Sequence, residues 1–210
     1  MARVKVCGLT NETDLGVAVE AGADAVGAIV DVPVDTPREV DPSRAATLFD
    51  SAPPFVSTVL VTMPESIDRA TELVERTRPD VLQVHAGLPP ESIDELVESG
   101  ITTVAAVDHG DDVEAFAEAA DALIVDSTDE SGAGGTGRTH DWAATSNLGP
   151  LAAPVVLAGG LTPENVTEAI EAVDPFAVDV SSGVEIEPGQ KDPGLVAAFV
   201  AEATGSEVRR

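Results

Sequence analysis

Residues 155–166 of the chain read VVLAGGLTPENV, and this stretch shows most clearly the pattern from which the fold is predicted. A short apolar run, Val155–Leu157, leads into Ala158-Gly159-Gly160 and then into Thr162-Pro163-Glu164. The run has the length and composition of a strand that is covered by helices, and Thr, Pro and Glu are favoured where helices begin. The stretch therefore predicts a buried strand, a glycine turn and a helix.

The same pattern occurs eight times along the 210 residues. Buried strands that alternate with helices predict a parallel sheet, and eight repeats predict an α/β fold that closes into a single (β/α)8 TIM barrel. We expect the barrel to span residues 1–204, with a polar tail at 205–210. An open, doubly wound sheet is the competing arrangement. The predicted strands are Arg3–Val6, Ala25–Val30, Phe55–Val61, Val81–Val84, Ile101–Ala106, Ala122–Val125, Val155–Leu157 and Phe176–Val180. The clearest predicted helix starts are Thr10–Asp14, Asp41-Pro42, Pro64-Glu65, Pro89–Glu91 and Thr162–Glu164.

The composition is strongly acidic, with 38 acidic residues against 11 basic ones and a formal net charge of −27. A field of this sign repels nucleic acid and anionic membranes, so neither is an expected partner. Two lysines, no tyrosine and many carboxylates are typical of the cytoplasmic proteins of salt-loving microbes, although an ordinary acidic protein is the alternative. The single cysteine cannot form an internal disulfide, and neither a signal peptide nor a membrane helix is indicated. We expect a soluble, cytoplasmic protein.

The active site of such a barrel lies at the carboxyl ends of the strands, so the polar residues that follow each apolar run are the candidates. Cys7 follows the first run. Side chains alternate along a strand, so Lys5 and Cys7 share one face, and Val4 and Val6 must point out toward the helices. An inward lysine near a thiol favours the thiolate, which is the better base. A buried cysteine that acts only as a small hydrophobic residue is the alternative.

Asp126 ends the sixth run and precedes a glycine-rich loop at residues 132–138. A carboxylate at this position can act as a general acid if burial raises its pKa, or it can simply stabilise the loop. The loop contains a G-x-G-x-x-G string, but it lies too far past the strand for a dinucleotide-binding turn. A loop that approaches the substrate is the better interpretation.

Glycines follow the last two predicted strands, at Gly159 and Gly160 and, after Ser182, at Gly183. Backbone N–H groups in such loops can approach an anion closely, and many barrels of this kind bind phosphate in their seventh and eighth loops. These residues therefore predict a phosphate site, with plain tight turns as the alternative. The expected ligand is a small phosphorylated molecule.

Three further side chains lie near predicted strand ends. Gln83 and His85 end the fourth run, and His85 is either a catalytic or a structural histidine. Arg38 follows the second run, where a guanidinium could bind a substrate carboxylate through two hydrogen bonds or could be a solvated surface group. No second His or Cys lies at metal-ligand spacing, so no metal site is predicted.

Taken together, these residues resemble the phosphoribosylanthranilate isomerase family of tryptophan biosynthesis over almost the whole chain. The order and spacing of several separated blocks carry the resemblance. They are Lys5–Thr10, Leu82–His85, Asp126 with Gly134–Gly137, His140–Trp142, Ala158–Val166, Asp179–Glu185 and Pro188–Asp192.

The resemblance implies an aldose–ketose isomerase that converts N-(5-phosphoribosyl)anthranilate to 1-(2-carboxyphenylamino)-1-deoxyribulose 5-phosphate by an Amadori rearrangement, without metal or cofactor. It assigns Cys7 as general base and Asp126 as general acid, and it places Arg38 against the anthranilate carboxylate. Gly160, Ser182 and Gly183 match the family's phosphate loops, with Gly159 beside them. We expect a monomer or a homodimer. The remaining substrate-binding candidates are Lys5, Gln83, His85 and Asp179.

The chain departs from the family pattern in the loop at 31–40 around Arg38 and at Ala86, where the family usually has glycine. Neither change removes the acid or the base. Two other functions compete with this interpretation. A related sugar-phosphate isomerase of histidine biosynthesis, or one that acts in both pathways, would carry a carboxylate on the first strand, where this chain has Cys7. A non-catalytic barrel that senses a phosphorylated metabolite would need the glycine loops but not both Cys7 and Asp126.

Overall fold

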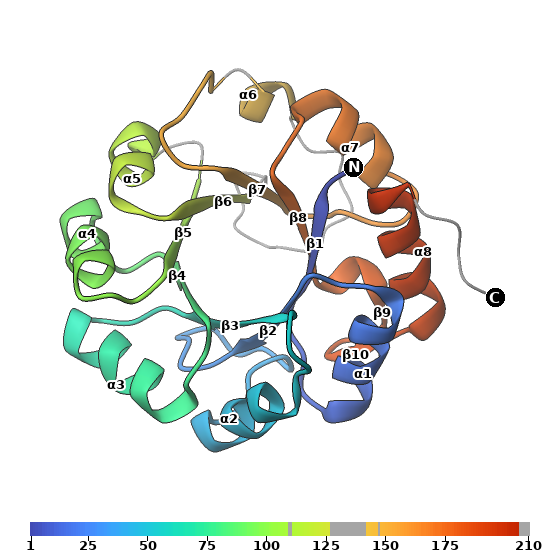
Figure 1. The fold of residues 1–210 in the computed structure, drawn as a ribbon, viewed down its shortest axis with the longest axis horizontal. Coiled ribbons are helices and arrows are strands. Elements are labelled where there is room, and N and C mark those ends of the chain that lie inside the picture. The colour runs from blue at the N-terminus through green and yellow to red at the C-terminus, as the bar shows by residue number, and fades with distance from the viewer. Residues whose placement is uncertain (109–110, 127–141, 147, 206–210) are drawn as a thin grey trace.

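The computed structural model describes residues 1–108, 111–126, 142–146 and 148–205. Within them, eight parallel strands close into a barrel in the order β1 to β8, as predicted (Figure 1). Each strand pairs with the next along the chain, and β8 closes the barrel against β1. The strands are β1 Arg3–Val6, β2 Ala25–Ile29, β3 Ser57–Thr62, β4 Val81–His85, β5 Thr103–Val107, β6 Ala122–Asp126, β7 Val155–Ala158 and β8 Ala177–Val180.

Helices surround the barrel on its outside (Figure 1). They begin at or near the predicted places, but α3 and α7 begin two to four residues later than expected. In α3 the cap is Ser66, whose side chain accepts a hydrogen bond from the Arg69 amide, so Pro64 lies before the helix. The helices are α1 Glu12–Ala21, α2 Pro42–Ser51, α3 Ile67–Thr77, α4 Pro90–Glu98, α5 Val113–Ala119, α6 Trp142–Ser146, α7 Val166–Val173 and α8 Pro193–Thr204. None of the helices in the described ranges is long and apolar enough to cross a membrane.

The two faces of β1 are used as the alternation predicts. Val4 and Val6 are buried in the main apolar core, which also contains Phe199 of α8. Cys7, which directly follows β1, packs instead with Val59 and Val61 of β3 in a second, smaller cluster. This separation places the helix-facing valines outside the barrel and the thiol within it.

Aspartates at the amino ends of three strands fasten the barrel together. Each lies just before an even-numbered strand, and its carboxylate accepts a hydrogen bond from a backbone N–H of the preceding odd-numbered strand. Hydrogen bonds to a charged acceptor are stronger than those between neutral groups, and these fix the register of neighbouring strands. The pairs are Asp24 with Val4 at 2.8 Å, Asp80 with Thr58 at 2.8 Å, and Asp121 with Thr103 at 2.9 Å.

Two phenylalanines that were predicted to begin strands do not. Phe55 is fully exposed and has a φ of +74°, so the chain turns there before β3 begins at Ser57. Phe176 lies just before β8, at the position that aspartate occupies before β2, β4 and β6. Its ring lies 4.2 Å under the guanidinium of Arg3, a cation–π contact at the amino end of β1.

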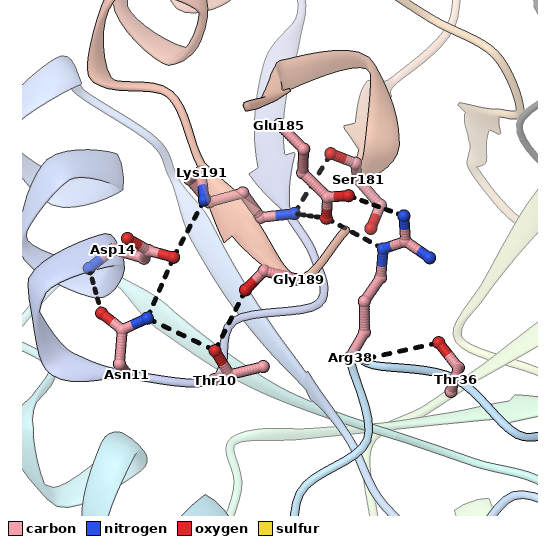
Figure 2. Close-up of polar contacts among 9 residues, drawn as sticks. All are labelled: Thr10, Asn11, Asp14, Thr36, Arg38, Ser181, Glu185, Gly189 and Lys191. Atoms are coloured by element: carbon pink, nitrogen blue, oxygen red, sulfur yellow. Dashed lines mark hydrogen bonds and ion pairs between the residues drawn. The ribbon is translucent and has the colours of Figure 1, made fainter. Parts of the chain in front are cut away.

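A small two-stranded sheet between β8 and α8 was not predicted. A short 3₁₀ helix, Ser182–Val184, leads into β9 (Glu185–Glu187), which pairs antiparallel with β10 (Gln190–Lys191). The segment is polar and lacks the apolar run that revealed the barrel strands. It nevertheless brings two charged side chains, Glu185 and Lys191, close to Arg38 (Figure 2). They lie at the mouth of the barrel, which is the end that holds the carboxyl ends of the strands.

Candidate active site

The central ion pair of the mouth joins β1 to β8. Lys5 lies directly opposite Asp179 in the register of these neighbouring strands. The Lys5 Nζ lies 2.9 Å from Asp179 Oδ1, and the two side chains are 9% and 11% exposed. Burial acts to lower the pKa of Lys5, but the charge of Asp179 and the nearby thiol outweigh it and raise the pKa above its ordinary value. Lys5 is therefore a buried, protonated ammonium.

The Cys7 thiol lies beside this pair. A Cβ atom on Gly27 of β2 would lie 3.1 Å from Cys7 Sγ and 3.4 Å from Lys5 Nζ, so the missing side chain makes room for both groups. Burial raises the pKa of the thiol above its ordinary value, while the positive charge of Lys5 acts in the opposite direction. The prediction that Lys5 favours the thiolate is right for the effect of Lys5 itself. Desolvation of the buried thiol is the larger effect, so the net shift of its pKa is upward.

Arg38 reaches the mouth from the loop between β2 and α2 (Figure 2). Its side chain passes over Gly8, where an added Cβ would lie 2.9 Å from Arg38 Cδ. Its Nε and Nη2 atoms donate hydrogen bonds of 2.8 and 2.6 Å to the two carboxylate oxygens of Glu185. These bonds raise the pKa of the guanidinium. Arg38 thus lies beside Gly8 and has a carboxylate partner that the sequence did not predict.

Glu185 is shared between Arg38 and Lys191 (Figure 2). The Lys191 Nζ donates to Glu185 Oε1 at 2.8 Å and to the Ser181 carbonyl oxygen at 3.1 Å. Burial acts to raise the pKa of Glu185, but the hydrogen bonds from Arg38 and Lys191 outweigh it and hold the pKa below its ordinary value. Glu185 is therefore an ionised carboxylate between two cations.

The two predicted phosphate loops lie against each other. Gly159 and Gly160 both have positive φ values, 88° and 54°, and form the turn after β7. A Cβ on Gly183 would collide with the carbonyl oxygen of Leu161, so only glycine allows the loop after β8 to approach so closely. Asn165 secures the turn by donating to the Gly160 carbonyl oxygen at 3.1 Å. Ser182, next to Gly183, is exposed.

The remaining predicted residues lie elsewhere around the barrel. Gln83 is buried, and His85 is half-buried at the end of β4. Asp126 ends β6, where its backbone pairs with Ala158 of β7. The Asp126 side chain and the glycine-rich loop at 132–138 lie outside the described residues.

Sequence reasoning missed the roles of Glu185, Lys191 and Ser181. Within the described part of the chain, the Ser181 hydroxyl is buried and has no hydrogen-bond partner, and it lies 2.8 Å from where a Cβ of Gly8 would be. One available signal was the rarity of lysine: the chain has two, and each forms an ion pair at the mouth. The described residues contain no group of three or more His, Cys, Asp or Glu that could hold a metal ion.

The buried thiol, the three ion pairs and the contacting glycine loops all lie at the carboxyl end of a closed parallel barrel, which is where (β/α)8-barrel enzymes have their active sites. The model of the family described as N-(5'-phosphoribosyl)anthranilate (PRA) isomerase matches residues 4–202. The chain belongs to this family of isomerases, as the resemblance predicted.

Individual relatives agree with this assignment. The N-(5'-phosphoribosyl)anthranilate isomerase of Halorubrum lacusprofundi is 56% identical over 207 residues, which cover 97% of each chain. Its halophilic source agrees with the interpretation of the acidic composition. The crystal structure of phosphoribosyl anthranilate isomerase from Thermotoga maritima is 36% identical, with a TM-score of 0.88, and the match covers 98% of this chain and 100% of that one. A second solved isomerase, in complex with reduced 1-(o-carboxyphenylamino)-1-deoxyribulose 5-phosphate, is 34% identical with a TM-score of 0.84 and the same coverage.

Proposed function

We propose that the protein converts N-(5-phosphoribosyl)anthranilate to 1-(2-carboxyphenylamino)-1-deoxyribulose 5-phosphate by an Amadori rearrangement, with Cys7 as general base and Asp126 as general acid. The observation that carries the proposal is the buried Cys7 thiol beside the Lys5–Asp179 ion pair at the carboxyl end of β1. A relative that binds the reduced product supports the same substrate class.

The reaction donates one proton and removes another, so a protonated acid and a deprotonated base must act on one substrate. In the proposed sequence, Asp126 protonates the furanose ring oxygen, and the ring opens to a Schiff base. The Cys7 thiolate then removes the proton from ribose C2, and the resulting enolamine tautomerises to the ketone. These steps move protons within one molecule with no net oxidation or reduction, so they need no redox cofactor.

The Lys5 ammonium has a specific part in this proposal. Burial disfavours the thiolate of Cys7, and the charge of Lys5 is the largest influence that favours it. Asp179 acts against the thiolate, but it also holds Lys5 in place with a 2.9 Å contact. The pair therefore fixes a cation next to the base and limits how far its pKa rises.

The two ends of the substrate have separate proposed sites. The phosphate binds at the contacting loops that contain Gly159, Gly160, Ser182 and Gly183, because these loops offer backbone N–H groups at close approach. The anthranilate carboxylate binds to Arg38, on the β2 side of the mouth. Gln83 and His85 complete the substrate-binding surface from β4.

The test is the loss of fluorescence of freshly generated phosphoribosylanthranilate, with product identified as a ketose of unchanged mass. Asp126→Asn should lose turnover by about 10²-fold or more, the usual contribution of a general acid. Asp94→Asn, at an exposed position on α4, is the matched control and should turn over normally. Tight binding of the reduced product without turnover of the substrate, at any KCl concentration, would instead indicate a metabolite-sensing barrel.

A further inference from the structure

We infer that Glu185 is a positioning residue: it fixes the Arg38 guanidinium so that its free N–H groups face the substrate carboxylate, while Lys191 holds Glu185 in place. The inference deepens the proposed function and rests on it, because it concerns how the site recognises the carboxylate of the aromatic ring.

Among the described residues, the hydrogen bonds of the Arg38 side chain involve only one edge of its guanidinium. Glu185 takes one N–H from Nε and one from Nη2, at 2.8 and 2.6 Å, so it binds one edge of the planar group. The N–H groups of Nη1 and the second one of Nη2 lie on the other edge. The Arg38 side chain is 23% exposed, whereas that of Glu185 is 5% exposed. The buried carboxylate of Glu185 thus holds one edge of the guanidinium, while the Arg38 side chain remains partly accessible to solvent.

Glu185 is itself fixed through Lys191, whose side chain is fully buried. The Lys191 Nζ contacts both Glu185 and the Ser181 carbonyl oxygen, and its backbone N–H donates to Asp14 at 3.0 Å. Asp14 belongs to α1, so the contacts run from a barrel helix through the small sheet to Arg38 (Figure 2). An arginine on a loop usually loses side-chain entropy when it binds a ligand. Because these contacts already order the Arg38 side chain in the free protein, less entropy is lost on binding.

The charges of the cluster also fit an anionic ligand. An Arg38–Glu185 pair alone would be neutral and would attract a carboxylate weakly. Burial lowers the pKa of Lys191, and its hydrogen bond to Glu185 opposes this effect and favours the ammonium. With Lys191 protonated, the three groups together carry a net positive charge in a chain whose total charge is −27. A single carboxylate bound to Arg38 would neutralise the cluster.

The test measures equilibrium binding of two probes, the reduced product and its counterpart without the ring carboxylate. Glu185→Gln keeps the size of the side chain but removes its charge. It should weaken binding of the carboxylate probe about ten-fold, because loss of the fixed Arg38 orientation outweighs the removal of a negative charge from the site, and should leave the other probe unchanged. In an Arg38→Ala background, Glu185→Gln should add no further loss, because Glu185 acts only through Arg38.

A second variant, Glu185→Asp, keeps the charge, but its side chain is one methylene shorter and cannot reach both nitrogens of Arg38. It should also lose affinity for the carboxylate probe alone. A cooperative melting transition shows that each variant is folded. Equal weakening of both probes, or an additive loss in the Arg38→Ala background, would overturn the inference and leave Glu185 as a structural link. Failure of the wild-type protein to bind either probe would count against the proposed function itself.

Discussion

Lys5 and Asp179 form an ion pair of 2.9 Å across the junction where β8 closes the barrel against β1, and Cys7 follows Lys5 by two residues on the same face. Both ionic groups influence the thiol, in opposite directions: Lys5 lowers its pKa and Asp179 raises it. The protonation of the proposed base therefore depends on an ion pair whose two charged residues, Lys5 and Asp179, can be substituted separately.

Lys5→Met should move the ascending limb of kcat/KM against pH to higher pH. The base acts when deprotonated, so activity rises as pH passes through the thiol pKa, and removal of Lys5 raises that pKa further. Asp179→Asn removes the opposing charge and should move the limb to lower pH, which makes it the matched comparison. Limbs that coincide in both variants and the wild type would show that Cys7 is not the titrating base.

Asp80→Ala should lower the free energy of unfolding by about 1–2 kcal/mol, because it removes a charged acceptor from the backbone N–H of Thr58. Chemical denaturation measures the change. Asp94→Ala, on the exposed face of α4, is the control and should have almost no effect. If the two variants were equally stable, the aspartates before β2, β4 and β6 would not contribute to fastening the barrel.

Ala86→Gly should stabilise the protein by about 1 kcal/mol, because Ala86 has a φ of +66°, a left-handed conformation that is costly for a residue with a Cβ atom. Ala115→Gly, within α5, should change stability in the other direction, since glycine is unfavourable inside a helix. Thermal melting of both variants provides the measurement. A lower melting temperature for Ala86→Gly would mean that packing, not backbone strain, dominates at this position.

Much of the barrel could be predicted from the sequence, because apolar runs and helix-capping residues are local signals. Errors arose at the ends of elements and in polar segments. Phe55 has the composition of a strand residue but lies in a turn, and the helix after β3 begins at its cap, Ser66, instead of Pro64. The small sheet of β9 and β10 was missed because its residues are polar and pair only with each other.

The site was predicted less completely than the fold. Positions at strand ends, such as Cys7 and Asp179, follow from the barrel rule and the family resemblance. The link from Arg38 through Glu185 to Lys191 joins residues up to 153 positions apart, and no local pattern reveals it. The net pKa shift of Cys7 could not be foreseen either, since it depends on how deeply the thiol is buried.

Added KCl should raise the melting temperature, because like charges crowd a surface with a net charge of −27. The screening length falls from about 10 Å at 0.1 M salt to about 3 Å at 1 M, which weakens repulsion between carboxylates. Melting curves at increasing KCl concentrations measure the effect. A melting temperature that does not change with salt would contradict the halophilic interpretation of the composition.

The role of Cys7 as the base is tested by comparing the wild-type protein with Cys7→Ser in turnover of phosphoribosylanthranilate at molar KCl concentrations. Serine keeps nearly the same volume but is far less acidic than cysteine, so it cannot supply the base. We expect rapid loss of substrate fluorescence in the wild type, loss of turnover by about 10²-fold or more in the variant, and similar binding of the reduced product by both. Turnover by Cys7→Ser at a rate near that of the wild type would contradict the assignment of Cys7 as the base.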